Sequence, residues 1–331
     1  MQDILDVIVV GAGLSGIGTA CHLRSACPDK RLLILESRER SGGTWDLFRY
    51  PGIRSDSDMH TLGYNFKPWE DEKAIADGPS ILHYLRETAR ERGIDQFIRY
   101  EQQLQAANWS SSRQCWELSV RDGPSGETRQ LYSRFLMMCA GYYNYQRGHQ
   151  PDFPGRDDFA GTFVHPQFWP ESLDYRNKRV LVIGSGATAM TLLPALAEEA
   201  KEVLMLQRSP TWVVSRPARD RLANLLRAIL PLDLAYRITR WKNTRLQEWV
   251  YQRSRKQPQK MREMLLKRTA KELAGSADIA DFTPRYDPWD QRLCLVPDSD
   301  LFKSLRAGKA QVITGEIDHL TKSGVRLRDG T

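Results

Sequence analysis

Two stretches of the chain share one pattern, in which a short run of apolar residues leads into a glycine-rich turn. The first is Val7-Ile-Val-Val10 before Gly11-Ala-Gly13-Leu-Ser-Gly16, and the second is Arg179-Val-Leu-Val-Ile183 before Gly184-Ser-Gly186-Ala-Thr-Ala189. Such runs predict strands buried on both faces of a parallel sheet, and the apolar residues after each turn predict a helix. The chain is therefore predicted to be α/β, with two dinucleotide-binding Rossmann-like domains.

In the first unit, the three glycines have separate steric roles. Gly11 permits the tight turn, Gly13 lets the backbone approach a pyrophosphate, and Gly16 lets the helix pack closely on the strand. The next predicted strand, Arg31 to Glu36, ends in an acid where a carboxylate can hydrogen-bond a ribose hydroxyl. Because a carboxylate would repel a 2′-phosphate, this site predicts FAD or NAD rather than NADP.

The second unit has a basic residue at the equivalent place. Its next predicted strand, Val203 to Gln207, is followed directly by an arginine and a serine. A guanidinium beside a hydroxyl suits a 2′-phosphate, so we expect NADPH here. The residues expected to bind it are Gly184, Gly186, Thr188, Arg208 and Ser209.

Periodicity elsewhere predicts further elements. They are a helix over 79–93, a hairpin pairing Trp109 and 115–120 with 131–135, a strand over 135–141, and strands over 312–317 and 324–330. Residues from about 217 to 275 look like a helical insertion in the second domain. We expect its aromatic residues Trp241, Trp249 and Tyr251 to be core residues.

The composition limits the classes of protein to which the chain can belong. A chain of 331 residues suits two domains, and 41% hydrophobic with 27% charged residues is usual for a soluble globular protein. The N-terminus lacks a secretory signal pattern, and no apolar run is long enough to span a bilayer. Five cysteines without a C-x-x-C pair favour reduced thiols and a cytoplasmic location. We assign no metal ligands and expect no nucleic-acid partner.

Basic residues concentrate in the predicted helical insertion. Between Arg219 and Lys271 there are 15 Lys or Arg residues against four Asp or Glu, although the whole chain has a net charge of only +7. One interpretation is a set of solvated helix faces. The other is a surface that makes weak contact with an anionic membrane or a protein.

Two further segments carry a family resemblance. Ser41-Gly42-Gly43-Thr44-Trp45, then Tyr50-Pro51-Gly52 and Asp56, resembles the flavin-contacting loop of the class B flavoprotein monooxygenases. These comprise the flavin-containing and the Baeyer–Villiger monooxygenases. Residues 159–170 fit F-x-G-x-x-x-H-x-x-x-W-P, which resembles the Baeyer–Villiger form of the family fingerprint. The chain departs from many members in having Pro166-Gln167 after the histidine.

The resemblance implies an NADPH- and O₂-dependent flavin monooxygenase. FAD would occupy the first site, bound by Gly11, Gly13, Gly16, Glu36, Thr44, Trp45, Asp56 and Ala140. A C4a-peroxyflavin would oxygenate a ketone or a nitrogen or sulfur centre of a small organic substrate. Arg292 would stabilise negative charge and Asp56 would orient it, whereas His165 would either take part in catalysis or hold the linker geometry.

The predicted organisation is a first part of an FAD domain over 1–150, a linker over 151–178, and an NADP domain over 179–331. The family pattern continues beyond Thr331, so we expect a fragment or a shortened protein with an unpaired sheet edge and exposed apolar surface. The alternative function is a truncated nucleotide-binding flavoprotein without turnover. A disulfide reductase is disfavoured, because Cys21 and Cys27 lie away from the turn.

Overall fold

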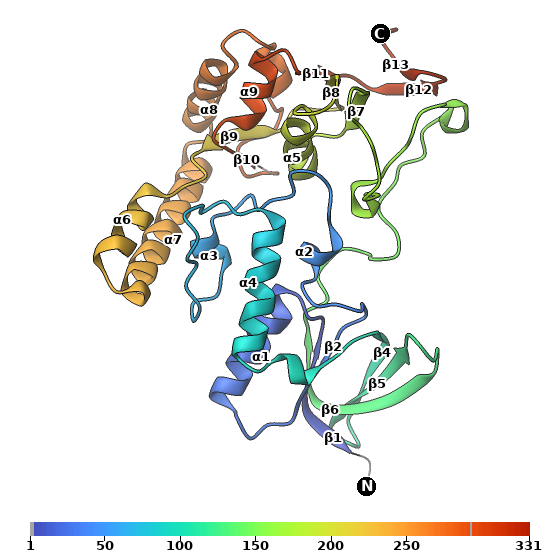
Figure 1. Cartoon of the computed structure of the whole chain (residues 1–331), viewed down its shortest axis with the longest axis vertical. Coiled ribbons are helices and arrows are strands. Elements are labelled where there is room, and N and C mark those ends of the chain that lie inside the picture. Colours follow the sequence, from blue (N-terminus) through green and yellow to red (C-terminus); the bar gives the residue numbers. More distant parts are fainter. Residues whose placement is uncertain (1–2, 292) are drawn as a thin grey trace. The chain divides into compact units, whose positions relative to one another are not determined.

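The computed structural model describes residues 3–291 and 293–331, which form two compact units (Figure 1). Unit 1 holds the chain up to Phe48 and residues 78–148, and unit 2 holds residues 49–77 and 149–331. The chain thus enters unit 2 for one short segment, returns to unit 1, and leaves it again. We expected residues 49–77 in the first domain, and the structure instead packs them with the second unit.

Unit 1 is built on a six-stranded sheet in the order β3-β2-β1-β6-β5-β4. The first four strands in that order are parallel, and β5 pairs antiparallel with both β6 and β4. The strands are β1 (Ile4–Val10), β2 (Leu32–Leu35), β3 (Ile98–Arg99), β4 (Gln102–Ser110), β5 (Cys115–Asp122) and β6 (Thr128–Met138). The two strands predicted beside the first glycine turn are present.

Strand β6 joins two kinds of pairing in one element. Sequence periodicity predicted separate strands over 131–135 and 135–141, but the structure has one continuous strand. Its first part pairs antiparallel with β5 as far as Ser133, and its last part pairs parallel with β1. The prediction of two strands was wrong because the change of partner needs no break in the extended backbone.

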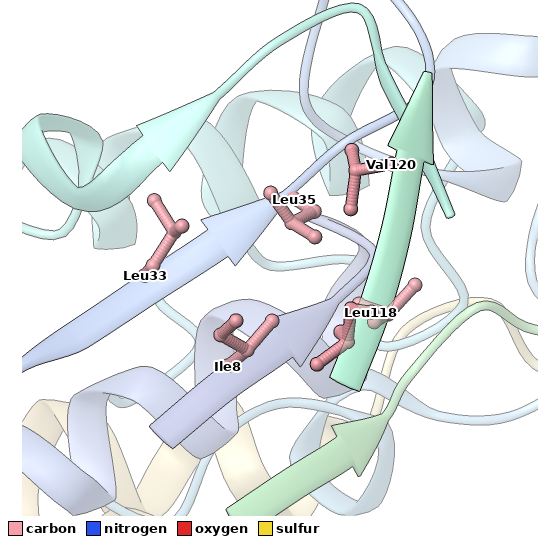
Figure 2. Packing of buried hydrophobic residues seen from close by; sticks show 6 residues of the cluster. Ile8, Leu33, Leu35, Leu118 and Val120 are labelled. Atoms are coloured by element: carbon pink, nitrogen blue, oxygen red, sulfur yellow. The ribbon is translucent and has the colours of Figure 1, made fainter. Parts of the chain in front are cut away.

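The core of unit 1 lies between the parallel strands and the β4–β6 meander (Figure 2). Figure 2 shows Ile8 and Leu33 on the parallel strands facing Leu118 and Val120 on β5. Because side chains alternate along a strand, Val7 and Val9 of β1 face the opposite side. There β1 contacts helix α1 (Leu14–Ala26), which in turn packs on α4 (Gly78–Glu91), the helix predicted over 79–93.

Unit 2 contains a parallel three-stranded sheet in the order β11-β8-β7, which contacts helices α5 and α9. A parallel pair, β9 with β10, and an antiparallel pair, β12 with β13, complete its strands within the described residues. The elements are β7 (Arg179–Ile183), α5 (Ala187–Leu196), β8 (Glu202–Gln207), β9 (Trp212–Arg216), β10 (Leu293–Pro297), α9 (Asp300–Arg306), β11 (Ala310–Thr314), β12 (Ile317–Thr321) and β13 (Gly324–Leu327).

The predicted helical insertion consists of α6 (Arg221–Ile229), α7 (Leu232–Lys256) and α8 (Pro258–Leu273). Helix α8 buries Met261 and Leu265 against Trp212 of β9. The prediction that the aromatic residues of α7 are core residues was wrong. Trp241 is 66% exposed and Trp249 is 57% exposed.

Side chains of helix α7 hold the segment 49–77 through hydrogen bonds, most of them to the backbone of that segment. Arg240 Nη1 donates to the carbonyl oxygens of His60 at 2.8 Å and Gly63 at 2.8 Å, and also to that of Thr61. Asn243 Nδ2 donates to Asp58 Oδ1 at 3.0 Å. Hydrogen bonds from a charged donor are each worth about 1.5–3 kcal/mol, so this contact fixes the short helix α3 (Met59–Leu62) on α7.

Apolar side chains are exposed where strands lack a neighbour on one side. Beyond Ser133, β1 is the one partner of β6 among the described residues, and Phe135 and Met138 there are 66% and 60% exposed. Strand β7 is at the end of its sheet, and Leu181 and Ile183 are exposed on it. Among the described residues, no helix is both long and apolar enough to cross a membrane. The five cysteines, all within that part of the chain, are free thiols.

Candidate functional site

The first glycine turn connects β1 to α1 with little room for side chains. The N–H of Gly11 donates to the Leu35 carbonyl oxygen at 2.7 Å, which joins the turn to the end of β2. A Cβ on Gly16 would overlap the carbonyl oxygen of Gly11, and one on Gly11 would overlap the carbonyl oxygen of Cys139. The next residue, Ala140, is exposed beside the turn. The turn therefore has the close backbone packing that a pyrophosphate-binding site requires.

A second glycine loop lies against the first. The N–H of Gly42 donates to the Ala12 carbonyl oxygen at 2.9 Å, and a Cβ on Gly43 would lie only 3.0 Å from the Cα of Gly13. Helix α2 (Thr44–Leu47) begins directly after Gly43 and presents Thr44 and Trp45 half-buried beside this contact. The predicted FAD residues of both loops thus meet within unit 1.

Glu36 lies at the base of the first turn and is only 2% exposed. Its Oε2 accepts from the N–H of Ala12 at 2.8 Å, and its Oε1 accepts from the N–H of Arg38 at 3.0 Å. These bonds hold the carboxylate at the end of β2, and each carboxylate oxygen retains capacity for a further donor. The backbone N–H groups of the turn and this fixed acceptor fit the pyrophosphate and ribose of FAD.

Sequence reasoning missed a buried acid in the same loop. Asp46 is 2% exposed, and its carboxylate pairs with Arg38 at 2.7 Å and Arg86 at 2.7 Å. Arg38 Nη1 also donates to the carbonyl oxygen of Gly43 at 3.3 Å. The sequence offers only a weak signal for this cluster, an acid directly after Thr44-Trp45, because the burial of the loop is visible only in the structure. The ion pairs fix the shape of the loop that carries Thr44 and Trp45.

The second glycine turn repeats the geometry of the first in unit 2. The N–H of Gly184 donates to the Leu206 carbonyl oxygen at 2.8 Å, which joins the turn to the end of β8. Gly184 has φ +133° and Gly11 has φ +102°, a backbone region that favours glycine. Gly186 precedes α5 with φ −82°, just as Gly13 precedes α1 with φ −88°. Both turns thus lead directly into the N-terminus of a helix, where backbone N–H groups have no partner within the helix itself.

The charge beside the second turn is opposite to that beside the first. Ser185 Oγ donates to the carbonyl oxygen of Ser209 at 3.1 Å, so this turn meets the segment that follows β8. The neighbouring residue, Arg208, is exposed and keeps its guanidinium available to solvent. An exposed guanidinium beside a helix N-terminus fits a 2′-phosphate and a pyrophosphate, the groups that distinguish NADPH.

The Tyr50-Pro51-Gly52 loop packs on the helix of this second site. A Cβ on Gly52 would lie 2.7 Å from the Cβ of Ala195 and 2.9 Å from the carbonyl oxygen of Thr191, so a larger residue would push the loop off α5. The hydroxyl of Tyr50 hydrogen-bonds the side chain of Thr188, and burial raises the pKa of this tyrosine. The loop expected to contact the flavin is thus anchored on the second nucleotide-binding helix.

Asp56 continues that loop and is exposed, with Ser57 Oγ donating to its Oδ1 at 3.4 Å. Two residues earlier, Arg54 forms an ion pair with Asp300 at the start of α9. Arg292, the predicted catalytic arginine, lies outside the described residues. The predicted pairing of Asp56 with Arg292 therefore stays a prediction.

The fingerprint histidine is held by the linker itself. Its Nδ1 accepts from the N–H of Gln167 at 3.2 Å, so Nε2 carries the proton and donates to the carbonyl oxygen of His149 at 3.2 Å. A Cβ on Gly161 would lie 2.5 Å from the ring of Phe159, so a glycine at position 161 leaves room for this ring. Of the two roles predicted for His165, these contacts favour holding the linker geometry.

A buried histidine that sequence reasoning did not single out lies on α3. His60 is 3% exposed, and its Nδ1 has no hydrogen-bond partner among the described residues. Burial lowers the pKa of His60 below its ordinary value of 6.5, and Arg227 and Lys242 lower it further. Asp58 and Asp220 oppose that lowering, so burial is the dominant cause.

This histidine predicts acid sensitivity of folding. The folded chain binds a proton at His60 less readily than the unfolded chain, which takes one up as the pH falls through about 6.5. The contribution that the neutral form of His60 makes to the free energy of unfolding is therefore fully present above that pH and is lost progressively below it. We expect the urea midpoint of His60→Gln to fall less than that of the wild type between about pH 7.5 and about pH 5.5.

The matched control for this prediction is His83→Gln, since the ring of His83 is 75% exposed on α4. That variant should keep the wild-type pH dependence. An equal fall of the midpoint in His60→Gln and the wild type would show that His60 does not contribute.

Comparisons with known proteins place this geometry in a family. The family model described as flavin-binding monooxygenase-like matches residues 58–279, and that of an NAD(P)-binding Rossmann-like domain matches residues 9–71. The FAD-containing monooxygenase EthA of Mycobacterium tuberculosis is 51% identical over 332 residues, covering 100% of this chain and 68% of EthA. The probable FAD-binding monooxygenase AlmA of Acinetobacter baylyi is 48% identical, covering 100% of this chain and 66% of AlmA.

Solved structures show the same fold at low sequence identity. Cyclohexanone monooxygenase from Rhodococcus sp. Phi1 bound to NADP⁺ has a TM-score of 0.77 at 20% identity, covering 100% of this chain and 69% of that one. The OTEMO complex with FAD and NADP (form 2) has a TM-score of 0.76 at 22% identity, with the same coverage.

The comparisons bear on the predictions made from sequence. They confirm the fold class and the resemblance to class B flavoprotein monooxygenases. They also confirm the predicted enzyme class as far as a flavin-binding monooxygenase, and the relatives at 51% and 48% identity are named as FAD-containing and FAD-binding monooxygenases. With a family model matched over residues 58–279 and a relative 51% identical along the whole chain, this protein belongs to the flavin-binding monooxygenase-like family.

Proposed function

We propose that the chain is an NADPH- and O₂-dependent monooxygenase that oxygenates a ketone, or a nitrogen or sulfur centre, of a small organic molecule. The observation that carries the proposal is the opposite charge beside two equivalent glycine turns. A buried carboxylate, Glu36, ends β2, whereas an exposed guanidinium, Arg208, follows β8. One turn thereby suits FAD and the other suits NADPH. The five free thiols support a cytoplasmic location as part of the same proposal.

Bound FAD would supply the redox chemistry by which NADPH and O₂ oxygenate the substrate. The chain's own residues bind and position the partners. Gly13 and Gly43 bring the two first-site loops together, and Asp46 with its arginines fixes the loop of Thr44 and Trp45. We propose that Arg292 stabilises negative charge in the reaction and that Asp56 orients it.

A ketone is the substrate class that we favour. The fingerprint ends in Trp169-Pro170, the form that resembles the Baeyer–Villiger enzymes. The ring of Trp169 packs edge-on against Tyr175, with ring centroids 6.1 Å apart, so this tryptophan is a fixed part of the linker. One of the solved structures with this fold is a cyclohexanone monooxygenase, and its name supports the same choice.

Rapid mixing tests the proposal. The FAD-loaded protein is reduced with NADPH without oxygen and then mixed with oxygen, while the flavin spectrum is recorded. A long-lived peroxyflavin absorbance that decays faster with a cyclic ketone than with a thioether is expected. No NADPH consumption by the FAD-loaded protein would overturn the proposal and leave a nucleotide-binding flavoprotein without turnover.

A further inference from the structure

Helix α7 exposes a stripe of apolar side chains. The residues that α7 buries are Ala235, Tyr236, Thr239, Asn243 and Ser254. The apolar residues that it exposes at spacings of three and four are Leu234, Ile238 and Trp241, and Trp249 follows about two turns later. A surface helix of a globular protein normally buries its apolar stripe, and the packing of the described residues does not explain this outward one.

Helix α6 also exposes apolar side chains. On its inner side Asn224 Nδ2 donates to the carbonyl oxygen of Glu72 at 3.1 Å, and Arg227 hydrogen-bonds the carbonyl oxygen of Glu70. Its outward residues Leu222, Leu225 and Ile229 are 46%, 56% and 66% exposed. Helices α6 and α7 pack on each other and are joined at Leu230-Pro231, and Figure 1 shows them side by side. We call the outward stripes of both helices the α6–α7 apolar face.

Positive charge surrounds the α6–α7 apolar face. Between Arg219 and Lys256 there are ten Lys or Arg residues and three Asp or Glu residues. Two of the acids are paired, Asp220 with Lys242 at 2.8 Å and Glu248 with Arg245 at 2.9 Å. Arg253 lies over the ring of Trp249, with 5.5 Å from its guanidinium carbon to the ring centroid. Arginine stems and tryptophan rings both suit a boundary between an apolar phase and water.

We infer that the α6–α7 apolar face docks on the surface of a membrane that contains anionic phospholipids. Apolar and aromatic side chains would enter the boundary between headgroups and acyl chains, while the surrounding arginines would meet lipid phosphates. Charge decides between this occupant and a second copy of the chain. A two-fold contact would bring two faces of the same positive charge together, which opposes association.

Vesicle binding tests the inference. The full chain is mixed with phosphatidylcholine vesicles and with vesicles of phosphatidylcholine and phosphatidylglycerol in equal parts, and the bound fraction is measured by co-sedimentation. We expect binding at least about tenfold stronger to the anionic vesicles, weakening as salt is raised. Trp241→Glu should reduce that binding by about tenfold or more, because it replaces an inserted ring with a charge repelled by the lipid.

The matched control is Trp109→Glu, since Trp109 is 50% exposed on β4 in unit 1. It should bind anionic vesicles like the wild type, and unchanged urea midpoints will show that both variants are folded. Absence of binding to the anionic vesicles would overturn the inference, as would equal losses in the two variants. It would also be overturned if the chain were a dimer that Trp241→Glu converts to a monomer without any vesicle binding.

Discussion

Replacing Arg208 by glutamate is expected to abolish the preference for NADPH over NADH. The guanidinium follows β8 beside the second glycine turn, where it is exposed and free to pair with a 2′-phosphate. Removing one partner of a hydrogen-bonded charge pair costs about 2–5 kcal/mol, and the new carboxylate adds repulsion. The KM for NADPH should therefore rise by about two orders of magnitude or more, whereas the KM for NADH changes little.

Titration calorimetry measures recognition of the 2′-phosphate by itself, without reduction of the flavin. The wild type should bind 2′,5′-ADP much more tightly than 5′-AMP, and Arg208→Glu should bind the two equally weakly. Arg268→Glu on α8 is the control, because it reverses the charge of another exposed arginine. If Arg208→Glu keeps the wild-type ratio of NADPH to NADH, another residue recognises the 2′-phosphate.

Gly16→Ala should produce a protein that does not retain FAD. The added Cβ would overlap the carbonyl oxygen of Gly11, so α1 would have to move away from β1 and the turn would change shape. Overpacking of this kind costs about 1–3 kcal/mol of stability, and the pyrophosphate-binding backbone is displaced as well. The measurements are the flavin absorbance per mole of purified protein and the urea midpoint.

Gly324→Ala is the control for the glycine substitution. The atom nearest to a Cβ at Gly324 is Thr321 Oγ1 at 4.0 Å, so that variant should keep both FAD and stability. Wild-type FAD content in Gly16→Ala would contradict the packing described for the first turn.

Local stereochemistry explains why both nucleotide turns could be predicted. The signals at Gly11 and Gly184, and the charges of Glu36 and Arg208, lie within one strand–turn–helix unit each. Strand β6 could not be predicted as one element, because its two parts are defined by different partners, β5 and β1. Periodicity describes a strand's faces and not its neighbours.

The remaining site features depend on contacts between distant parts of the chain. Arg240 holds the segment 49–77 through backbone carbonyl oxygens of residues such as His60 and Gly63, and a carbonyl leaves no signal in the sequence. Asp46 is buried where Arg38, from the loop after β2, and Arg86, from α4, converge on it. The exposed stripe of α7 was misassigned because periodicity shows that apolar residues share a face but not what covers that face.

Residues 49–77 belong to unit 2 although they lie between two parts of unit 1 in the sequence, and this matters for making chimaeras within the family. A single junction near residue 150 would exchange the N-terminal half as one block, and it would carry 49–77 away from the Arg240 side chain that holds them. A hybrid that respects the structure needs three junctions, after residues 48, 77 and 148. The segment 49–77 is therefore inherited with the second nucleotide site, although it lies in the first half of the polypeptide.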